Sequence, residues 1–213
     1  MSRPHVTWKV ATSLDGRIAT SSGESRWITG EAARLEGHRL RAASDAILVG
    51  VETVLADDPR LTTRLPDGGR DPLRVILDSK LRTPDFALVA VPGTLILTTA
   101  EPRPVGAAEV MRVAANQQRR PAVEAVLDEL GARGVTRLLV EGGGRVAAAF
   151  INAGAIDAIE WFRAPMLLGA EGRPCLGLLA LKRLSDAPRF RRLAAELLDD
   201  DLWERLERVR AHD

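Results

Sequence analysis

Three consecutive glycines follow a short apolar run and open a helix of small residues. The segment extends from Leu138 to Phe150 and contains Glu141-Gly-Gly-Gly144. Backbone amides without side chains at a helix N-terminus can bind a phosphate, because the helix end also carries a partial positive charge. Ala147 stands where the dinucleotide fingerprint needs its third glycine, and no P-loop lysine follows. The run therefore indicates either a phosphate-binding turn or a tight turn that requires positive φ.

Two arginines are candidates for binding a phosphate group. Arg41 falls near the end of the first expected helix, and Arg64 follows Leu61-Thr-Thr63. A guanidinium presents a planar fork of N–H donors that matches phosphate oxygens. Taken singly, each arginine is more often a solvated surface charge, so the residues alone leave both interpretations open.

Three other charged residues are placed where chemistry could occur. Asp57 precedes a proline at the start of a loop, and Glu141 ends an expected strand, where open α/β sheets bind ligands. The alternatives are a turn residue that caps local amides for Asp57 and a solvated loop charge for Glu141. Lys9 lies in an apolar strand on the face opposite Trp8 and Val10, where an exposed lysine is the ordinary interpretation.

Ser25 and Trp27 either line a pocket or belong to a capped loop with a buried indole. The chain's histidines, His5, His38 and His212, form no pair with the spacing of metal ligands, so we expect no metal site.

Composition narrows the class of protein. The chain has 213 residues, enough for one domain, which we expect to extend over residues 1–213. The net charge of +1 gives no sign of a nucleic-acid or acidic-membrane partner. Cys175 is the only cysteine, which is typical of a reducing compartment. With no signal peptide and no apolar run near ~18 residues, we expect a cytoplasmic protein.

Hydrophobic patterns predict strands and helices in alternation, which is typical of an α/β fold with a largely parallel sheet. The predicted strands cover Val6–Val10, Ala46–Val49, Arg74–Asp78, Thr94–Thr98, Leu138–Val140 and Ala158–Phe162, and the predicted helices cover Gly30–Ala43, Arg145–Ala153 and a segment from Pro121. The tail is ambiguous: Phe190 to Val209 fits a helical stripe, yet Asp199-Asp-Asp201 interrupts it like a turn.

Several strings occur together in a characteristic order: Lys9-Val-Ala-Thr-Ser-Leu-Asp-Gly-Arg17, Ser25-Arg-Trp-Ile-Thr29, Ala46-Ile-Leu-Val-Gly50, Thr53-Val-Leu-Ala-Asp-Asp-Pro59, Leu61-Thr-Thr-Arg64 and Val140-Glu-Gly-Gly-Gly144. With them, the chain resembles the reductase domain of the bacterial bifunctional riboflavin-biosynthesis deaminase/reductase, from about Val6 to Leu206. The resemblance implies a dihydrofolate-reductase-like three-layer α/β sandwich with a mainly parallel central sheet, a C-terminal antiparallel hairpin turning at Asp199–Asp201, and a homodimer.

The resemblance also implies the functional residues. NADPH is the implied cofactor, held by Ala11, Trp27, Thr53, Ser79, Gly143, Gly144 and Arg145. The implied substrate residues are Ser25, Arg41, Leu61, Arg64 and Glu141, with the two arginines on a phosphate. Asp57 is the implied acid, and Lys9 is the alternative. We expect Ser79, Lys80 and Arg82 to favour NADPH over NADH by contacts with its 2′-phosphate.

The implied reaction reduces 5-amino-6-(5-phosphoribosylamino)uracil to its ribitylamino product. A diamino pyrimidine reduced before deamination, an unrelated substrate on the same fold, or a non-catalytic nucleotide-binding protein are the alternatives. Met166 departs from the family, which often carries lysine there. One cysteine cannot supply the deaminase zinc signature, so we expect deamination to come from a separate protein.

Overall fold

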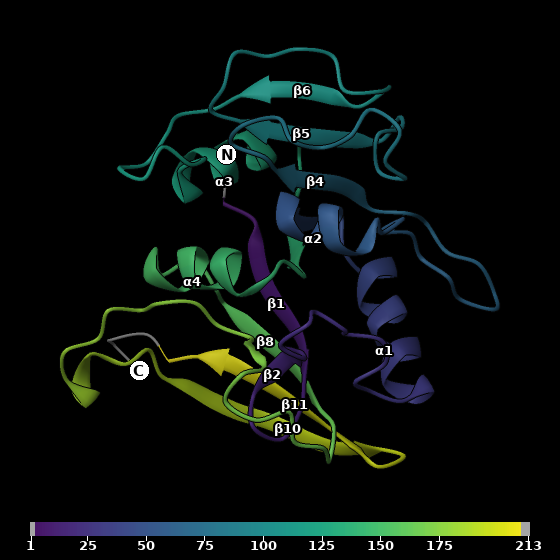
Figure 1. Ribbon diagram of the computed structural model, residues 1–213, viewed down its shortest axis with the longest axis vertical. Coiled ribbons are helices and arrows are strands. Elements are labelled where there is room, and N and C mark those ends of the chain that lie inside the picture. Colours follow the sequence, from purple (N-terminus) through teal and green to yellow (C-terminus); the bar gives the residue numbers. More distant parts are fainter. Residues whose placement is uncertain (1–2, 210–213) are drawn as a thin grey trace. The chain divides into compact units, whose positions relative to one another are not determined.

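The computed structural model in Figure 1 describes residues 3–209, which divide into two compact units. The first unit contains residues 3–5 and 38–143, and the second contains residues 6–37 and 144–209. Helix α1 (Glu31–Ala42) contributes its first part to the second unit and its last residues to the first. None of the helices in the described part of the chain is long and apolar enough to cross a membrane.

The first unit contains a parallel sheet of five strands in the order β7-β3-β4-β5-β6, and Figure 1 shows β4, β5 and β6 side by side. The strands are β3 (Ala46–Gly50), β4 (Leu73–Leu77), β5 (Thr94–Thr98), β6 (Glu109–Arg112) and β7 (Arg137–Val140). Every residue of β3 and β5 is buried, which explains why Ala46–Val49 and Leu95–Leu97 are continuous apolar runs rather than alternating ones.

Two helices complete the first unit. Helix α2 (Val51–Asp57) follows β3 directly, and α3 (Val123–Ala132) buries the apolar stripe predicted from its spacing. One hydrophobic cluster joins strands, α2 and the loops after α2, β4 and β5: Ile47, Val49, Val54, Leu61, Ile76, Leu81, Ala87, Val89, Ala90, Ile96 and Val105.

The second unit contains four strands in the order β10-β11-β8-β1. Strands β1 (His5–Thr12) and β8 (Ala158–Arg163) pair in parallel, whereas β11 (Asp201–Arg208) pairs antiparallel with both β8 and β10 (Phe190–Leu198). The unit also contains α4 (Gly144–Asn152), a short 3-10 helix (Leu184–Asp186), and β2 (Arg17–Ala19) paired with β9 (Arg173–Pro174).

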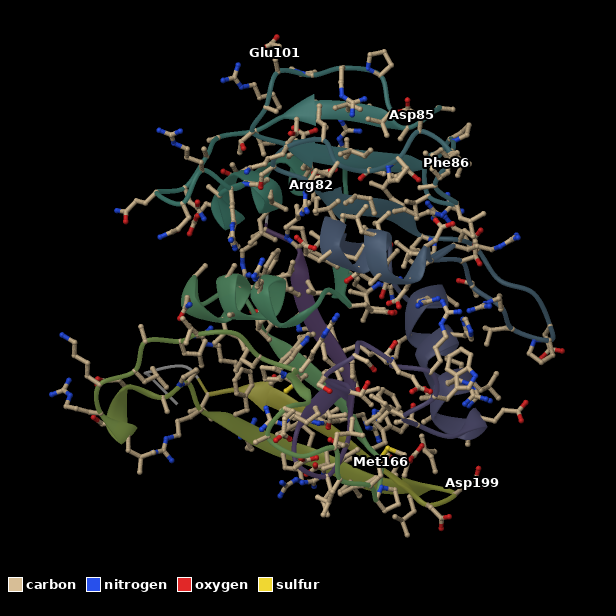
Figure 2. The ribbon with its side chains drawn as sticks, in the orientation of Figure 1. Arg82, Asp85, Phe86, Glu101, Met166 and Asp199 are labelled. Carbon is tan, nitrogen blue, oxygen red and sulfur yellow. The ribbon has the colours of Figure 1, made fainter. Side chains whose placement is uncertain are left out.

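The tail is the predicted hairpin, and its helical alternative is wrong. Strands β10 and β11 are joined at Asp199 and Asp200, and Asp199 has a φ of +54°. Figure 2 labels Asp199 at this turn. The sheet decides the outcome, because β8 offers β11 a full ladder from Ala158 to Arg163. A short segment with a helical stripe becomes a strand when such an edge is available.

The predicted α/β class with mainly parallel pairing is confirmed, as is each strand and helix predicted upstream of the tail. Strands β2, β6 and β9 were not predicted. Two of them are only two or three residues long, and β6 has no fully buried residue, so none carries a clear apolar pattern.

Candidate active site

Glu141 and Arg41 form an ion pair in the first unit. Arg41 Nε donates to Glu141 Oε1 at 2.8 Å, and its Nη2 donates to Oε2 at 2.7 Å. The side chains are 16% and 11% exposed, so water screens this two-pronged pair poorly. Desolvation acts to lower the pKa of Arg41, but the Glu141 carboxylate raises it by more. Glu141 is therefore not the solvated loop charge that was its alternative interpretation.

The loop after α2 meets this pair. Arg41 Nη1 donates to the carbonyl oxygen of Thr62 at 3.1 Å. Leu61 has a φ of +53° and a buried side chain in the hydrophobic cluster. A bulky residue adopts this conformation only when its surroundings impose it. Because the side chain of Leu61 packs in the hydrophobic cluster, only the backbone of Leu61 can contact a ligand. Arg64 is exposed.

His38 lies near Arg41, Arg64 and Glu141, whose charges act on its imidazole, and sequence reasoning missed it because a lone histidine shows no ligand spacing. Burial lowers the pKa of its imidazole below 6.5, and the charges of Arg41 and Arg64 lower it further. Glu141 and a hydrogen bond with the Thr62 backbone act in the opposite direction. Its Nδ1 is buried without a hydrogen-bond partner among the described residues.

Asp57 is the last residue of α2, and its side chain is half-buried. The next residue, Asp58, ends the helix in the left-handed region with a φ of +39°. Asp58 Oδ1 accepts a hydrogen bond from the Leu88 amide at 2.8 Å, so Asp58 ties the end of α2 to a later loop. The candidate acid, Asp57, therefore lies at the end of α2, and the hydrogen bond of the next residue, Asp58, fixes this end of the helix.

The glycine run is needed for close approach rather than for positive φ. A Cβ on Gly144 would lie 3.0–3.1 Å from the backbone of Pro174, Cys175 and Gly177, and no positive φ occurs at Gly143 or Gly144. The interpretation of a turn that requires positive φ is therefore wrong. In the first unit, a Cβ on Gly143 would lie 4.0 Å from Thr53 Oγ1, so two predicted cofactor residues are neighbours.

The predicted 2′-phosphate loop is shaped by a buried aspartate. Asp78 Oδ2 accepts hydrogen bonds from Thr83 N at 2.7 Å and Thr83 Oγ1 at 2.8 Å. These bonds close the loop that carries Ser79, Lys80 and Arg82. Arg82, labelled in Figure 2, donates to Glu52 of α2 at 2.5 Å, and both side chains are exposed.

Lys9 belongs to the second unit. Trp8 and Val10 are buried and Lys9 faces the opposite side, as the alternation predicts. It is not an ordinary exposed lysine, however. Its Nζ lies 5.3 Å from the centroid of the Phe162 ring, a cation–π distance, and a Cβ on Gly37 would lie 3.5 Å from its Cε. The ammonium is therefore held in place by β8 and α1.

The remaining predicted residues of the second unit vary in exposure. Trp27 is 64% exposed, and the Arg34 guanidinium lies 4.5 Å from its ring centroid, so the alternative of a buried indole is wrong. Ala11 and Ser25 are half-buried, and Arg145 is exposed in the first turn of α4. Among residues 3–209, no group of three or more histidine, cysteine, aspartate or glutamate side chains could hold a metal ion.

Residues 4–202 match the model of the RibD C-terminal domain family. The chain belongs to this family. It is 42% identical over 180 residues to the riboflavin biosynthesis protein RibD of Bacillus amyloliquefaciens, covering 81% of this chain and 48% of that protein. It is also 35% identical to a 2,5-diamino-6-ribosylamino-4(3H)-pyrimidinone 5′-phosphate reductase of Methanothermobacter thermautotrophicus, covering 94% and 96% of the two chains.

Solved structures agree with this assignment. A RibD structure from Acinetobacter baumannii matches with a TM-score of 0.86 and 32% identity, over 98% of this chain and 59% of that one. A dihydrofolate reductase from Enterococcus faecalis, at 16% identity and a TM-score of 0.54, shares the fold. The chain spans about half the length of the curated RibD relatives it matches, at 48% and 43% for two of them.

Proposed function

We propose that the protein is an NADPH-dependent reductase of riboflavin biosynthesis that converts 5-amino-6-(5-phosphoribosylamino)uracil into its ribitylamino product. The observation that carries the proposal is the paired Arg41 and Glu141 beside the loop of Leu61 and Arg64, in a chain of the RibD C-terminal domain family. Such a group of cations and one carboxylate suits a ligand that has both a phosphate and sugar hydroxyls.

Each side chain has a role in this proposal. Arg64 and the remaining N–H groups of Arg41 bind the phosphate, and Glu141 accepts hydrogen bonds from the pyrimidine or the ribose. Ser25 and the Leu61 backbone complete the substrate contacts. Asp57 donates the proton that the ring oxygen needs when the sugar opens, and Lys9 is the alternative donor.

The residues fit a nicotinamide cofactor. Thr53 beside Gly143, and Gly144 packed against backbone, provide the bare amides and the hydroxyl that a pyrophosphate needs. Ala11, Trp27, Ser79 and Arg145 are the other proposed contacts. When bound, NADPH would supply the hydride that reduces C1′. Because Arg82 is paired with Glu52, we assign the 2′-phosphate first to Ser79 and Lys80.

A second substrate has a specific observation in its favour. The relative named for the 2,5-diamino pyrimidine is 35% identical over 94% of this chain and 96% of its own length, so the substrate in its name is a candidate for this chain. In that case reduction precedes deamination. In the uracil case, a separate deaminase acts first. We also propose that residues 1–213 work as one reductase domain and assemble as a homodimer.

One experiment tests these proposals. NADPH oxidation is followed at equal concentrations of the deaminated and the diamino pyrimidine phosphates, and again with NADH. We expect the uracil compound and NADPH to give the higher kcat/KM values, the cofactor preference being at least about tenfold from one charge-assisted contact. Faster reduction of the diamino compound would assign the second substrate, and no oxidation with either would disprove the proposed function.

A further inference from the structure

One long loop carries two of the proposed substrate residues, Leu61 and Arg64. It extends over residues 58–72, between α2 and β4, and these residues form no helix or strand (Figure 1). An irregular loop of this length samples many conformations unless its own contacts hold it. The place of the Arg64 guanidinium therefore depends on the contacts that fix the loop.

Asp71 folds this loop back on itself. Its Oδ1 accepts a hydrogen bond from the backbone amide of Thr63 at 2.7 Å, eight residues earlier in the chain. Thr63 Oγ1 donates in turn to the carbonyl oxygen of Arg70 at 3.2 Å. A Cβ on Gly69 would lie 2.8 Å from Thr63 Cγ2, so a side chain at Gly69 would push Thr63 away. The residue directly before Arg64 is thus fixed through both its amide and its hydroxyl.

Arg74, in β4, holds the two ends of the loop together. Its Nε donates to the carbonyl oxygen of Arg60 at 3.0 Å, and its Nη2 lies 3.3 Å from Asp71 Oδ2. Its Nη1 donates to the carbonyl oxygen of Pro92 at 3.3 Å. Only 11% of the Arg74 side chain is exposed, so its donors point into the protein. A compact surface loop whose ends are held close is an Ω-loop, a kind of loop that is frequently functional.

Arg41 anchors the same segment from α1. Its Nη1 donates to the carbonyl oxygen of Thr62 at 3.1 Å, so both residues that precede Arg64 have fixed backbones. Arg64 itself is exposed. Because the loop is already ordered, a phosphate that binds Arg64 does not have to pay the conformational entropy of ordering it.

We propose that Asp71 is a positioning residue of the subsite that binds the substrate's phosphate: with Arg74, it holds the loop in the conformation that presents Arg64 and the Leu61 backbone. The inference rests on the proposed function for the identity of the phosphorylated ligand. It goes beyond that function because Asp71 acts through Thr63 and touches no phosphate. The sign of its effect is distinctive. As a negative charge alone, Asp71 would repel a dianion, so its removal would tighten binding; as a positioning residue, its removal weakens binding.

Ribose 5-phosphate is the probe, since it has the phosphate and the sugar of the proposed substrate and its binding needs no turnover. Asp71→Ala removes the contacts with Thr63 and Arg74, whereas Asp71→Asn keeps an oxygen for the Thr63 amide and loses the ion pair. We expect Kd from isothermal titration to rise about 3–10-fold in Asp71→Ala, from the loss of one hydrogen bond and one half-exposed ion pair. The rise should be smaller in Asp71→Asn.

Turnover provides a second measurement. The KM of the phosphorylated uracil substrate should rise by the same factor as the Kd of ribose 5-phosphate. The kcat should stay near that of the wild type, because the hydrogen bond of Asp58 with Leu88 fixes the end of α2 independently of Asp71. The Kd of NADPH should also be unchanged, since Ser79 lies outside this loop.

Asp67→Ala is the matched control. Asp67 is exposed on the same loop, and within residues 3–209 it has no hydrogen-bond or ion-pair partner, so this variant changes the charge without changing a contact. It should bind ribose 5-phosphate at least as tightly as the wild type. Trypsin tests the loop without any ligand: cleavage of the native protein after Arg64 should be faster in Asp71→Ala than in the wild type, and unchanged in Asp67→Ala.

The outcomes separate this inference from the proposed function. Unchanged or tighter binding of ribose 5-phosphate in Asp71→Ala overturns the role of Asp71, even in an enzyme that reduces the pyrimidine. Equal trypsin cleavage after Arg64 in Asp71→Ala and the wild type overturns it as well, and so does a wild type that does not bind ribose 5-phosphate. Weaker binding in Asp71→Ala, in a protein that reduces neither pyrimidine, supports the inference and disproves the proposed substrate.

Discussion

Glu141 and Arg41 form an ion pair with each other in the protein without a ligand. Glu141→Gln keeps the shape of the side chain but removes the charge that Arg41 faces at 2.7 Å. We predict that substrate affinity falls by about 1.5–3 kcal/mol, the value of a hydrogen bond to a charged group, while NADPH affinity stays near that of the wild type. Isothermal titration of folded protein with each ligand measures this.

The matched control is Glu109→Gln, which removes another carboxylate from an arginine. Glu109 is 54% exposed in its pair with Arg133, and such surface pairs contribute about 0–1 kcal/mol. This variant should bind both ligands normally. Equal loss of substrate and cofactor affinity in Glu141→Gln would indicate damage to the fold rather than a lost contact.

Asp57 and Asp58 provide a matched pair for the proton-transfer hypothesis. We predict that Asp57→Asn lowers kcat by ~10²–10⁴ while substrate still binds, because the amide has no proton to give at the reacting oxygen. The pH profile of kcat should lose one limb. Asp58→Asn should keep nearly full activity, since an amide oxygen can still accept the Leu88 N–H and asparagine tolerates positive φ. Full turnover in Asp57→Asn would contradict the role of Asp57 as the proton donor, and Lys9 would be the next residue to substitute.

At the scale of elements, a single aspartate determines the shape of the loop after β4. Asp78 is fully buried and accepts both the amide and the hydroxyl of Thr83. We predict that Asp78→Ala destabilises the protein by about 1.5–3 kcal/mol, because two buried donors lose a charged acceptor. Because Ser79 is its neighbour, NADPH affinity should fall as well. Urea unfolding and cofactor titration measure the two effects.

Asp85, labelled in Figure 2, provides the comparison on the same stretch of chain. It is 68% exposed and lies 3.7 Å from Arg103, so Asp85→Ala should change stability by no more than about 0.5 kcal/mol. A stability of Asp78→Ala equal to that of Asp85→Ala would contradict the importance of the buried hydrogen bonds.

The sequence predicts the elements well where an apolar pattern is long. The buried runs of β3 and β5 and the stripe of α3 are recognisable from residue type alone. The tail is not, since the helical stripe from Phe190 competes with pairing to β8, and only the family resemblance favours the hairpin. The contacts of Arg41 with Glu141, a hundred residues away, depend on tertiary structure that no local pattern encodes.

For the candidate site, the residue types could be predicted but their partners could not. Leu61 is an implied substrate residue whose side chain lies in the core. Arg82, which we expect to contact the 2′-phosphate of the cofactor, is paired with Glu52. His38 lacks any sequence signal, because its significance arises from Thr62 and the surrounding charges. The partners of these three residues come from distant segments of the chain, so they depend on tertiary packing and electrostatics that the sequence alone does not reveal.

At the scale of the whole molecule, acid stability should depend on carboxylates that the fold binds through hydrogen bonds. Asp45 Oδ2 accepts from Thr136 Oγ1 at 2.6 Å, Thr136 N at 3.0 Å and Arg137 N at 2.8 Å. The Thr136 hydroxyl is the main cause that lowers the pKa of Asp45 below its ordinary 3.8. The native state then binds fewer protons than the unfolded chain, so this contribution is complete above pH 3.8 and is lost as pH falls through the folded pKa.

Asp45→Asn tests that linkage. It keeps an oxygen for the same donors but removes the charge, so at neutral pH we predict a loss of about 1 kcal/mol in the free energy of unfolding, the difference between charged and neutral hydrogen bonds. The deficit should narrow as pH falls below about 4, where the wild-type carboxyl also becomes neutral. Urea midpoints from pH 3 to 7 measure this, with the exposed Asp128→Asn on α3 as control. A deficit that is constant across this pH range would mean that the substituted amide disturbs the packing between β3 and β7 and that the charge of Asp45 contributes nothing.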